Sequence, residues 1–364
     1  MICTGRLPGD STADAALPNA VSRVPIPSSR LRTLLGQLQW GRQVLQLDRR
    51  FGFRFVWCDN IRPSAYPANL LFRRRRLPYG VLLHGSDLFD LRGNFRRSRF
   101  KRMVARRLLG DAAVLVANSR WTADLAREVL GELDLERSIP RVRVVPLGTD
   151  PLRFRPGIDS AGFRRERGLP DGPWIVTVAR LELYKGADIV MRALRLLAGN
   201  GRPLRYAIVG EGPARAELEA LARSEGVADR VHFLGAVPDS SLPEAYALAD
   251  IYAGMTRQTE REAEGFGIAL VEAQACGKPV VAGRGGGTAD AVSDGETGLL
   301  VDPLDSGAVA AAVNALLADS SRAAAMGAAG RRAVERYYNW DRVIADLRAI
   351  GEAMGPVGRG GAGG

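Results

Sequence analysis

Two glutamates in the second half of the chain have a spacing that could serve a bound sugar nucleotide. Glu264 and Glu272 stand with seven residues between them in the segment AEGFGIALVEAQACGKPVVA. Gly265 and Gly267 come just before an apolar helical stretch, so free backbone N–H groups and the positive end of a helix dipole could bind an anion there. Carboxylates repel an anion unless they face neutral hydroxyls, and a sugar nucleotide carries such hydroxyls on both sides of its diphosphate. If the two glutamates lay on a solvated surface helix, the residues between them would be more polar than Ile268 and its apolar neighbours.

A pair of cations in the loop VARLELYKG could neutralise that diphosphate. Arg180 and Lys185 follow a strand that ends at Val178 and precede a helix. Arginine presents a planar fork and lysine a compact point charge, so together they can hold neighbouring phosphates without a metal ion. The chain has only three lysines, and one of them is in this loop. Taken alone the segment could be an ordinary basic loop, but beside the glutamates it indicates a diphosphate site.

Alternating strands and helices must position these residues. Six apolar, β-rich runs are expected to be strands, at Trp174–Val178, Tyr206–Val209, Val231–Leu234, Ile251–Ala253, Pro279–Ala282 and Leu299–Val301. Helices are expected between them, at Ala187–Ala198, Ala214–Ser224 and Leu242–Ala249. This order indicates a doubly wound sheet of parallel strands with crossover helices. Ligands of such sheets bind outside the carboxyl ends of the strands, so the chemistry is expected in the loops that follow strands.

The first half of the chain shows a weaker form of the same pattern. Strands are expected at Phe53–Cys58, Tyr79–Leu83, Ala113–Ala117 and Val142–Val145, and helices at Arg30–Phe51 and Arg99–Leu109. The turn-rich stretch PLGTDPLRFRPG (146–157) predicts the connection between two domains. The length of 364 residues also favours two domains, because a single hydrophobic core rarely grows beyond about 250–300 residues.

Composition excludes several classes of protein. The chain is 46% hydrophobic and 25% charged, which is typical of a soluble globular protein and excludes disorder, collagen and coiled coil. No apolar run approaches the roughly 18–20 residues of a membrane span, and the N-terminus lacks the pattern of a signal peptide. The three cysteines, Cys3, Cys58 and Cys276, indicate neither a disulfide framework nor a zinc site. A cytoplasmic location is therefore expected.

Positive charge is concentrated in the first third of the chain. Residues 1–110 hold 20 Arg and one Lys against six Asp and no Glu, a net charge of +15, whereas the remainder carries −4. Codon preference would explain Arg over Lys but not the missing Glu, so the charge favours an anionic partner. Arg73–Arg76 and the segment FRRSRFKRMVARRLLG (95–110) could bind an anionic membrane surface at the inner face of the cell membrane. Burial of that helix in a domain core is the competing interpretation.

Taken together, the motifs resemble those of the retaining glycosyltransferases of family 4, which have the GT-B fold. The resemblance is carried by the Arg…Lys loop, the pair of glutamates, GEGP (210–213), FLGAVP (233–238) and GETGLLVDP (295–303), in the order and spacing of the family. HGSDL (84–88), ANS (117–119) and PLGTD (146–150) match its N-terminal landmarks. The similarity covers roughly residues 75–364, with a weaker match before that. The joint set is highly specific, although each piece alone would be weak.

The resemblance implies a role for each matched position. Arg180 and Lys185 would stabilise the departing nucleoside diphosphate. Glu264 would contact the donor sugar, and His84 would lie near that sugar at the wall of the N-terminal domain, which completes the implied catalytic set. Glu272 would hydrogen-bond the ribose. The other implied donor-binding positions are Gly265, Phe266, Gly267, Gly286, Gly287, Thr288, Gly210 and Val237.

The implied architecture is a pair of Rossmann-like, doubly wound α/β domains that face a cleft. Residues 1–155 would form the acceptor domain and 156–337 the nucleotide-sugar donor domain. A helix at 338–354 would cross back to the N-terminal domain, and the glycine-rich tail 355–364 is expected to be disordered. Family members begin with a first strand and a glycine-rich loop. No such loop is evident in this sequence, so the N-terminal domain is expected to lack the first strand, either because the start codon lies upstream or because the protein is shortened.

The predicted function is a retaining, metal-independent hexosyltransferase that moves a hexose from a nucleotide-diphosphate sugar to a glycan or lipid acceptor. No metal-ligand cluster is evident, and no cofactor is expected beyond the donor. A nucleic-acid partner is not expected, because aromatic residues are not interleaved with the positive charges. His232, inside a strand, is expected to be structural. Another GT-B enzyme, such as a nucleotide-sugar epimerase or a phosphorylase, and a shortened scaffold subunit without transferase activity remain as alternatives.

Overall fold

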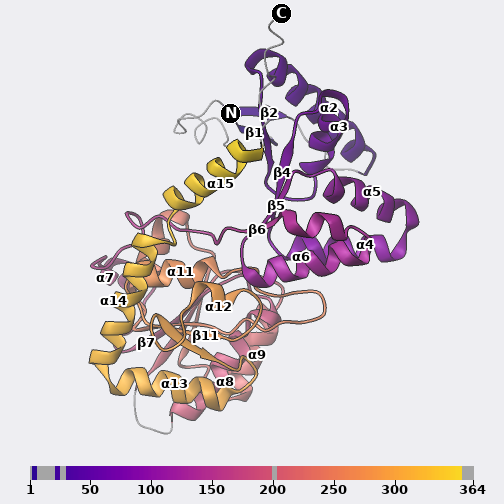
Figure 1. Ribbon diagram of the computed structural model, residues 1–364. Coiled ribbons are helices and arrows are strands. Elements are labelled where there is room, and N and C mark those ends of the chain that lie inside the picture. The colour runs from indigo at the N-terminus through magenta and orange to yellow at the C-terminus, as the bar shows by residue number, and fades with distance from the viewer. Residues whose placement is uncertain (1, 6–20, 25–29, 199–202, 355–364) are drawn as a thin grey trace, which may run out of the picture.

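The computed structural model shows two α/β parts, each built around a parallel sheet (Figure 1). It describes residues 2–5, 21–24, 30–198 and 203–354. The predicted disordered tail, 355–364, lies outside the described residues. Among the described residues, no helix combines the length and the apolar character that a membrane span requires.

The C-terminal part contains a six-stranded sheet in the order β12-β11-β10-β7-β8-β9, and every neighbouring pair is parallel. Its strands are β7 (Trp174–Val178), β8 (Arg205–Val209), β9 (Val231–Gly235), β10 (Ile251–Gly254), β11 (Val280–Gly283) and β12 (Gly298–Val301). Its helices are α7 (Ala161–Glu166), η2 (Leu183–Lys185), α8 (Ala187–Ala198), α9 (Arg215–Ser224), η3 (Asp239–Ser241), α10 (Leu242–Ala247), α11 (Ile268–Ala275), α12 (Thr288–Ala291), α13 (Ser306–Ala318) and α14 (Ser320–Arg336). This arrangement confirms the predicted doubly wound sheet.

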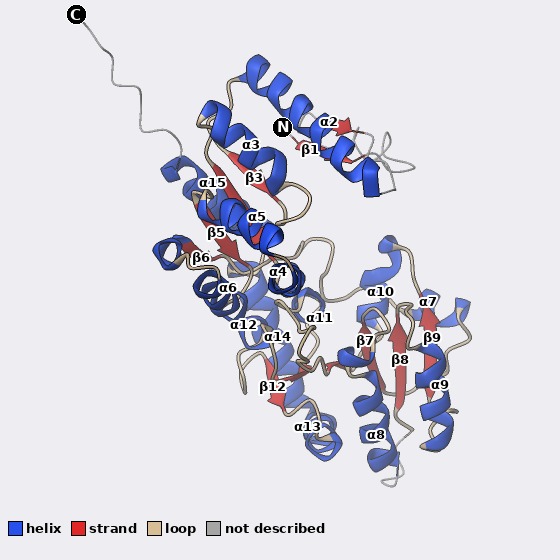
Figure 2. Cartoon of the chain, turned by 90° about the vertical axis from the view of Figure 1, so that its right-hand side faces the viewer, coloured by secondary structure: helices blue, strands red, loops and turns tan. Residues whose placement is uncertain are grey.

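Helices cover both faces of this sheet because successive strand residues point to opposite sides. Val281 packs into the core that α8, α9 and α13 share, whereas its neighbour Val280 packs into the core beneath α11 and α14. Figure 2 shows α8 and α9 beside β7, β8 and β9. The strands therefore read as continuous apolar runs, as expected of a parallel sheet buried on both faces.

The N-terminal part contains a four-stranded parallel sheet in the order β3-β4-β5-β6. Its strands are β3 (Val56–Cys58), β4 (Tyr79–Leu83), β5 (Val114–Ala117) and β6 (Val142–Val144). Its helices are α2 (Arg30–Phe51), α3 (Ala65–Arg75), α4 (Ser86–Arg97), α5 (Arg99–Gly110), α6 (Arg120–Glu132) and η1 (Glu136–Arg141). The predicted helix at Arg30–Phe51 and strand at Tyr79–Leu83 are confirmed to the residue.

Two further strands precede α2 and were not predicted from the sequence. β1 (Ile2–Gly5) and β2 (Val21–Val24) pair with each other in parallel. They form a separate two-stranded sheet and do not join the β3–β6 sheet. Each strand is only four residues long, and neither forms the continuous apolar run by which the strands of the two larger sheets were predicted.

The last helix, α15 (Trp340–Met354), returns from the C-terminal part to the N-terminal sheet (Figure 1). Its side chains Val343, Leu347 and Ile350 pack against an apolar cluster that includes Val114 and Val116 of β5. At the start of the helix, the chain turns against the 146–150 segment. The backbone N–H of Thr149 donates to the carbonyl of Tyr338 at 2.9 Å.

A glycine allows this close approach, and replacing it should weaken the docking of α15. A Cβ added at Gly148 would overlap the backbone of Asn339. We expect Gly148→Ala to lower the free energy of unfolding by about 1–3 kcal/mol, because overpacking forces the backbone apart. Gly162→Ala is the control: its Cβ would meet nothing within 4 Å in α7, so it should be neutral or stabilise by about 0.5–1 kcal/mol. Urea unfolding measures both, and equal effects would contradict the packing argument.

Candidate active site

An ion pair joins two loops at the carboxyl ends of the C-terminal strands. Lys185 ends the short η2 turn after β7, and Glu264 lies in the loop between β10 and α11. The Lys185 Nζ lies 2.8 Å from Glu264 Oε2, and the Thr256 hydroxyl donates to the same oxygen at 3.3 Å. The two charged side chains are 18% and 22% exposed. The structure therefore brings together two residues that are 79 positions apart, where the strand-end rule predicts a site.

A cavity of about 250 Å³ opens beside this ion pair. Arg180, Lys185, Glu264 and Gly267, all predicted from the sequence, line it. The Arg180 side chain is 66% exposed, and its guanidinium lies 3.7 Å from Glu182. The cavity is thus walled by one cation close to Glu264 and a second, more exposed cation on the same loop.

Gly210 supports the loop that carries these cations. Its φ is +137°, and a Cβ there would overlap the carbonyl oxygen of Ala179. The neighbouring Leu181 donates its backbone N–H to the carbonyl of Glu211 at 2.9 Å. The GEGP turn after β8 therefore packs directly against the Arg180 loop, and the two backbones can come this close because Gly210 has no Cβ.

Gly286, Gly287 and Thr288 support the segment that carries Glu264. A Cβ at Gly286 would overlap the carbonyl oxygen of Glu264, and the Gly287 N–H donates to that oxygen at 2.7 Å. The buried Thr288 hydroxyl reaches the carbonyls of Gly283 at 2.7 Å and Gly285 at 2.9 Å. Its hydrogen-bonding capacity is thus used within its own loop. Direct contact of these three residues with a donor stays a prediction.

The turn before α11 separates side-chain and backbone roles. Gly267 is the N-cap of α11 with a φ of +97°, which leaves the first backbone N–H groups of the helix free of a side-chain cap. The Phe266 side chain is buried and packs against the ring of Tyr338, with the two ring centroids 6.0 Å apart. Phe266 is therefore a core residue, and only its backbone is suited to bind a donor.

Glu272 lies apart from the Lys185 cavity, on the side of α11 that faces Tyr246. The Tyr246 hydroxyl donates to Glu272 Oε2 at 2.5 Å. Burial raises the pKa of the Glu272 carboxyl above its ordinary value of 4.5, although the Tyr246 hydrogen bond and Arg153 oppose that shift. Val237 packs against an apolar cluster that also includes residues of β7 and β8. The structure thus places Glu272 and Val237 outside the residues that line the Lys185 cavity.

His84 lies where the two parts of the chain touch. Its ring Nε2 is 2.7 Å from the carbonyl oxygen of Asp59, so this nitrogen carries the proton. Its backbone N–H donates to Asp87 at 3.1 Å. A Cβ added at Gly265 would overlap the carbonyl oxygen of His84. The loop after β4 therefore meets the segment beside Glu264.

Sequence reasoning missed the polar contacts that complete this junction. Arg120 donates from its backbone N–H to Asp290 at 2.8 Å and from its Nε at 2.5 Å. The Thr122 hydroxyl donates to the carbonyl of Gly265 at 3.3 Å. Arg120 and Asp290 are 170 positions apart, and no signal in a single sequence links them.

The second histidine does not belong to this site. The Nε2 of His232 is buried without a partner in the described structure, and its ring packs edge-on against Trp174 at 5.0 Å. Burial lowers the pKa of His232. These contacts agree with the structural role expected for it. Within the described residues, no group of three or more His, Cys, Asp or Glu side chains could hold a metal ion.

Comparison with known proteins identifies the family. Residues 160–333 match the family model described as glycosyl transferases group 1, and residues 1–148 match the glycosyl transferase 4-like domain. The GDP-mannose-dependent alpha-(1-6)-phosphatidylinositol monomannoside mannosyltransferase of Mycolicibacterium smegmatis is 41% identical over 320 residues, which is 87% of this chain and 77% of that protein. The chain belongs to the group 1 glycosyltransferases.

Other members of the family match over a smaller share of their length. The D-inositol 3-phosphate glycosyltransferase of Acidothermus cellulolyticus is 38% identical over 257 residues, covering 67% of this chain and 55% of that enzyme. Among solved structures, Anabaena HepE in complex with UDP-glucose superposes on this glycosyltransferase with a TM-score of 0.75 at 22% identity. The match covers 97% of this chain and 91% of HepE, and it confirms the GT-B fold.

The raised pKa of Glu272 predicts a pH-dependent cost in stability. A carboxyl whose pKa is higher in the folded than in the unfolded state destabilises the fold as pH rises through that window. We expect Glu272→Gln to raise the free energy of unfolding at pH 7 and to lose this advantage near pH 4. Glu217→Gln, on the exposed face of α9, is the matched control. Urea unfolding at both pH values tests this, and a pH-independent difference would refute it.

Proposed function

We propose that this glycosyltransferase moves a hexose, with retention of configuration, from a nucleoside diphosphate sugar to an inositol-containing acceptor. The Lys185–Glu264 pair beside the cavity carries the proposal, because it puts a cation and a hydroxyl-binding carboxylate within 2.8 Å. Lysine has three N–H donors, so two remain for phosphate oxygens while one bonds Glu264. Glu264 can then accept a hydrogen bond from a sugar hydroxyl, because the positive charge of Lys185 offsets the repulsion between this carboxylate and the diphosphate.

Fixed positive groups would supply the catalysis. Charge grows on the leaving diphosphate as the glycosidic bond breaks, and donors already aimed at it favour the transition state. Arg180 and Lys185 would hold the diphosphate in place of a divalent ion. The free N–H groups at the start of α11 would add to them. His84, with its proton on Nε2, would stand on the opposite wall near the sugar.

The nucleoside would extend toward Glu272. One oxygen of this carboxylate accepts from Tyr246, which fixes its orientation. The other would accept from the ribose hydroxyls. Val237, on the loop after β9, would pack beside the nucleoside. This assignment gives the sugar one glutamate, which lines the Lys185 cavity, and the ribose a second glutamate, which lies outside that cavity.

The names of two relatives support an inositol-containing acceptor that carries phosphate. One transfers mannose to a phosphatidylinositol monomannoside, and another acts on D-inositol 3-phosphate. The first third of this chain has a net charge of +15, which would attract such an anion. GDP-mannose is therefore the first donor to test.

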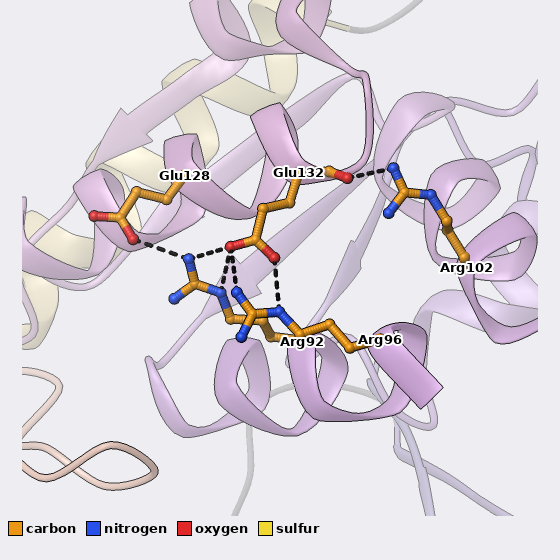
Figure 3. Close-up of polar contacts among 5 residues, drawn as sticks. All are labelled: Arg92, Arg96, Arg102, Glu128 and Glu132. Atoms are coloured by element: carbon orange, nitrogen blue, oxygen red, sulfur yellow. Dashed lines mark hydrogen bonds and ion pairs between the residues drawn. The ribbon is translucent and has the colours of Figure 1, made fainter. Parts of the chain in front are cut away.

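Surface charges in the N-terminal part are divided between two sides. On the side that faces α6, arginines are neutralised by acidic residues (Figure 3). Arg92 bonds Glu128 at 3.1 Å and also bonds Glu132, while Arg96 bonds Glu132 at 2.9 Å. These arginines stabilise the packing of α4 on α6. They are therefore poor candidates for contact with an external anion.

The exposed face of α5 has the composition of a membrane-binding surface. Phe100 is 70% exposed and Met103 is 40% exposed, on a helix that also exposes Arg99 and Arg107. Among the described residues, neither arginine forms an ion pair. Exposed apolar residues flanked by cations suit the interface of an anionic bilayer. We therefore propose peripheral binding to anionic lipid, which would bring the enzyme to a lipid acceptor.

The diphosphate clamp predicts the effect of one substitution. Lys185→Ala should lower kcat by about 10²–10³-fold, because it removes one preorganised charge. It should also abolish thermal stabilisation by the preferred donor among GDP-mannose, UDP-glucose and ADP-glucose. Arg223→Ala, at an exposed arginine of α9, is the control for loss of a surface cation. Transfer of labelled hexose to phosphatidylinositol is assayed with EDTA present; loss of turnover in EDTA, or no response to any nucleotide sugar, would contradict the proposal.

The exposed face of α5 predicts lipid-dependent sedimentation. At low salt the protein should bind vesicles that contain phosphatidylglycerol but not neutral phosphatidylcholine vesicles. The variant Phe100→Ser/Met103→Ser should lose most of this binding, because two inserted apolar side chains are removed. Leu152→Ser, at a leucine 83% exposed in the C-terminal part, controls for lost exposed apolar area. Equal binding to neutral vesicles, or an equal loss in both variants, would refute the assignment.

A further inference from the structure

A second ion pair connects the two loops that carry Lys185 and Glu264. Arg257 Nη1 lies 3.0 and 2.9 Å from the two carboxylate oxygens of Asp188. Asp188 is in the first turn of α8, directly after the turn that ends at Lys185. Arg257 lies at the other end of the loop that leads to Glu264. The pair therefore bridges the same two loops that meet in the active site.

Backbone contacts reinforce this bridge on both sides of Lys185. The Arg257 N–H donates to the carbonyl of Tyr184 at 2.8 Å. On the other side, Gly186 has a φ of +78°, and a Cβ there would overlap the carbonyl oxygen of Met255. The backbone from which the Lys185 side chain extends is thus fixed to the 255–257 segment immediately before and after the lysine.

The bridge is largely shielded from solvent, and it lies outside the donor cavity. The side chains of Asp188 and Arg257 are 12% and 20% exposed. A buried charge that loses its partner is strongly unfavourable, so each residue holds the other in place. Arg257 lines two surface grooves on the far side of the loop. It is absent from the residues that line the cavity of Lys185.

We propose that Arg257 and Asp188 are positioning residues that set the geometry of the Lys185–Glu264 pair. This inference rests on the proposed function, because it assigns the bridge to the diphosphate site. Lysine is a point charge on a flexible four-carbon stem, so its location depends on the backbone that carries it. A displacement of about 1 Å in a catalytic group can cost about 10²-fold in rate. The bridge prevents that displacement without touching the substrate.

A double-mutant cycle tests the proposal with the full chain. Calorimetry measures the Kd for GDP or for whichever nucleoside diphosphate the chain prefers, and kcat and KM are measured alongside. Arg257→Met should weaken nucleoside diphosphate binding by about tenfold or more and lower kcat by up to about 10²-fold. In a Lys185→Ala background the same change should have little further effect, because the group it positions is gone. Arg257→Lys and Asp188→Glu should restore part of the affinity.

A control variant distinguishes a positioning role from a general structural effect, and the pattern of results shows whether the inference or the proposed function fails. Arg195 is on α8, like Asp188, and its Nε lies 3.0 Å from Glu225. Arg195→Met removes this ion pair and should leave the Kd unchanged. An equal loss of affinity with and without Lys185 would show a general structural effect and overturn the inference. So would a folded Arg257→Met variant with native Kd and kcat. If Arg257→Met does not fold, Arg257→Lys and Asp188→Glu decide: a partial loss of affinity that disappears in the Lys185→Ala background supports the inference, and a native Kd in both variants overturns it. A native chain that binds no nucleoside diphosphate would overturn the proposed function itself.

Discussion

Close contact between backbones is the constraint on which the candidate site depends. Gly186, Gly210, Gly265 and Gly286 each stand where a Cβ would overlap a carbonyl oxygen of another loop. Side chains in real proteins do not tolerate such overlap, so these loops can meet only at glycine. The contacts bring the ends of β7, β8 and β10 together. The Lys185–Glu264 pair, 2.8 Å long, is the chemical result of this backbone packing.

Charge in this glycosyltransferase is divided by function as well as by sequence. Many arginines of the N-terminal part stabilise packing, as those on α4 do with Glu132 (Figure 3). Others, such as Arg99 on α5, remain exposed. The C-terminal part has fewer cations to spare, and it places two of them, Arg180 and Lys185, on the cavity. A net charge of +11 for the whole chain therefore says little about either site until each cation is assigned its partner.

Much of the fold could be predicted because parallel strands buried on both faces have a strong sequence pattern. The strand at Trp174–Val178 and the helix at Ala187–Ala198 were predicted to the residue. The strand-end rule also placed Lys185 and Glu264 in one site. It could not supply the contact between Arg120 and Asp290, because that depends on how two separate sheets dock. Nor could it show that the Phe266 side chain is buried or that the Thr288 hydroxyl is used within its loop.

The two parts of the chain are joined by contacts of unequal strength. At α15, Val343 is buried against β5, and a fully buried aliphatic side chain contributes about 1.5–3 kcal/mol. Beside the candidate site, the Arg120–Asp290 pair has an arginine that is 74% exposed, and pairs of that kind contribute about 0–1 kcal/mol. The apolar packing of α15 on β5 therefore holds the two parts together more strongly than this ion pair does, and the junction at the site depends instead on backbone contacts such as that between Gly265 and His84.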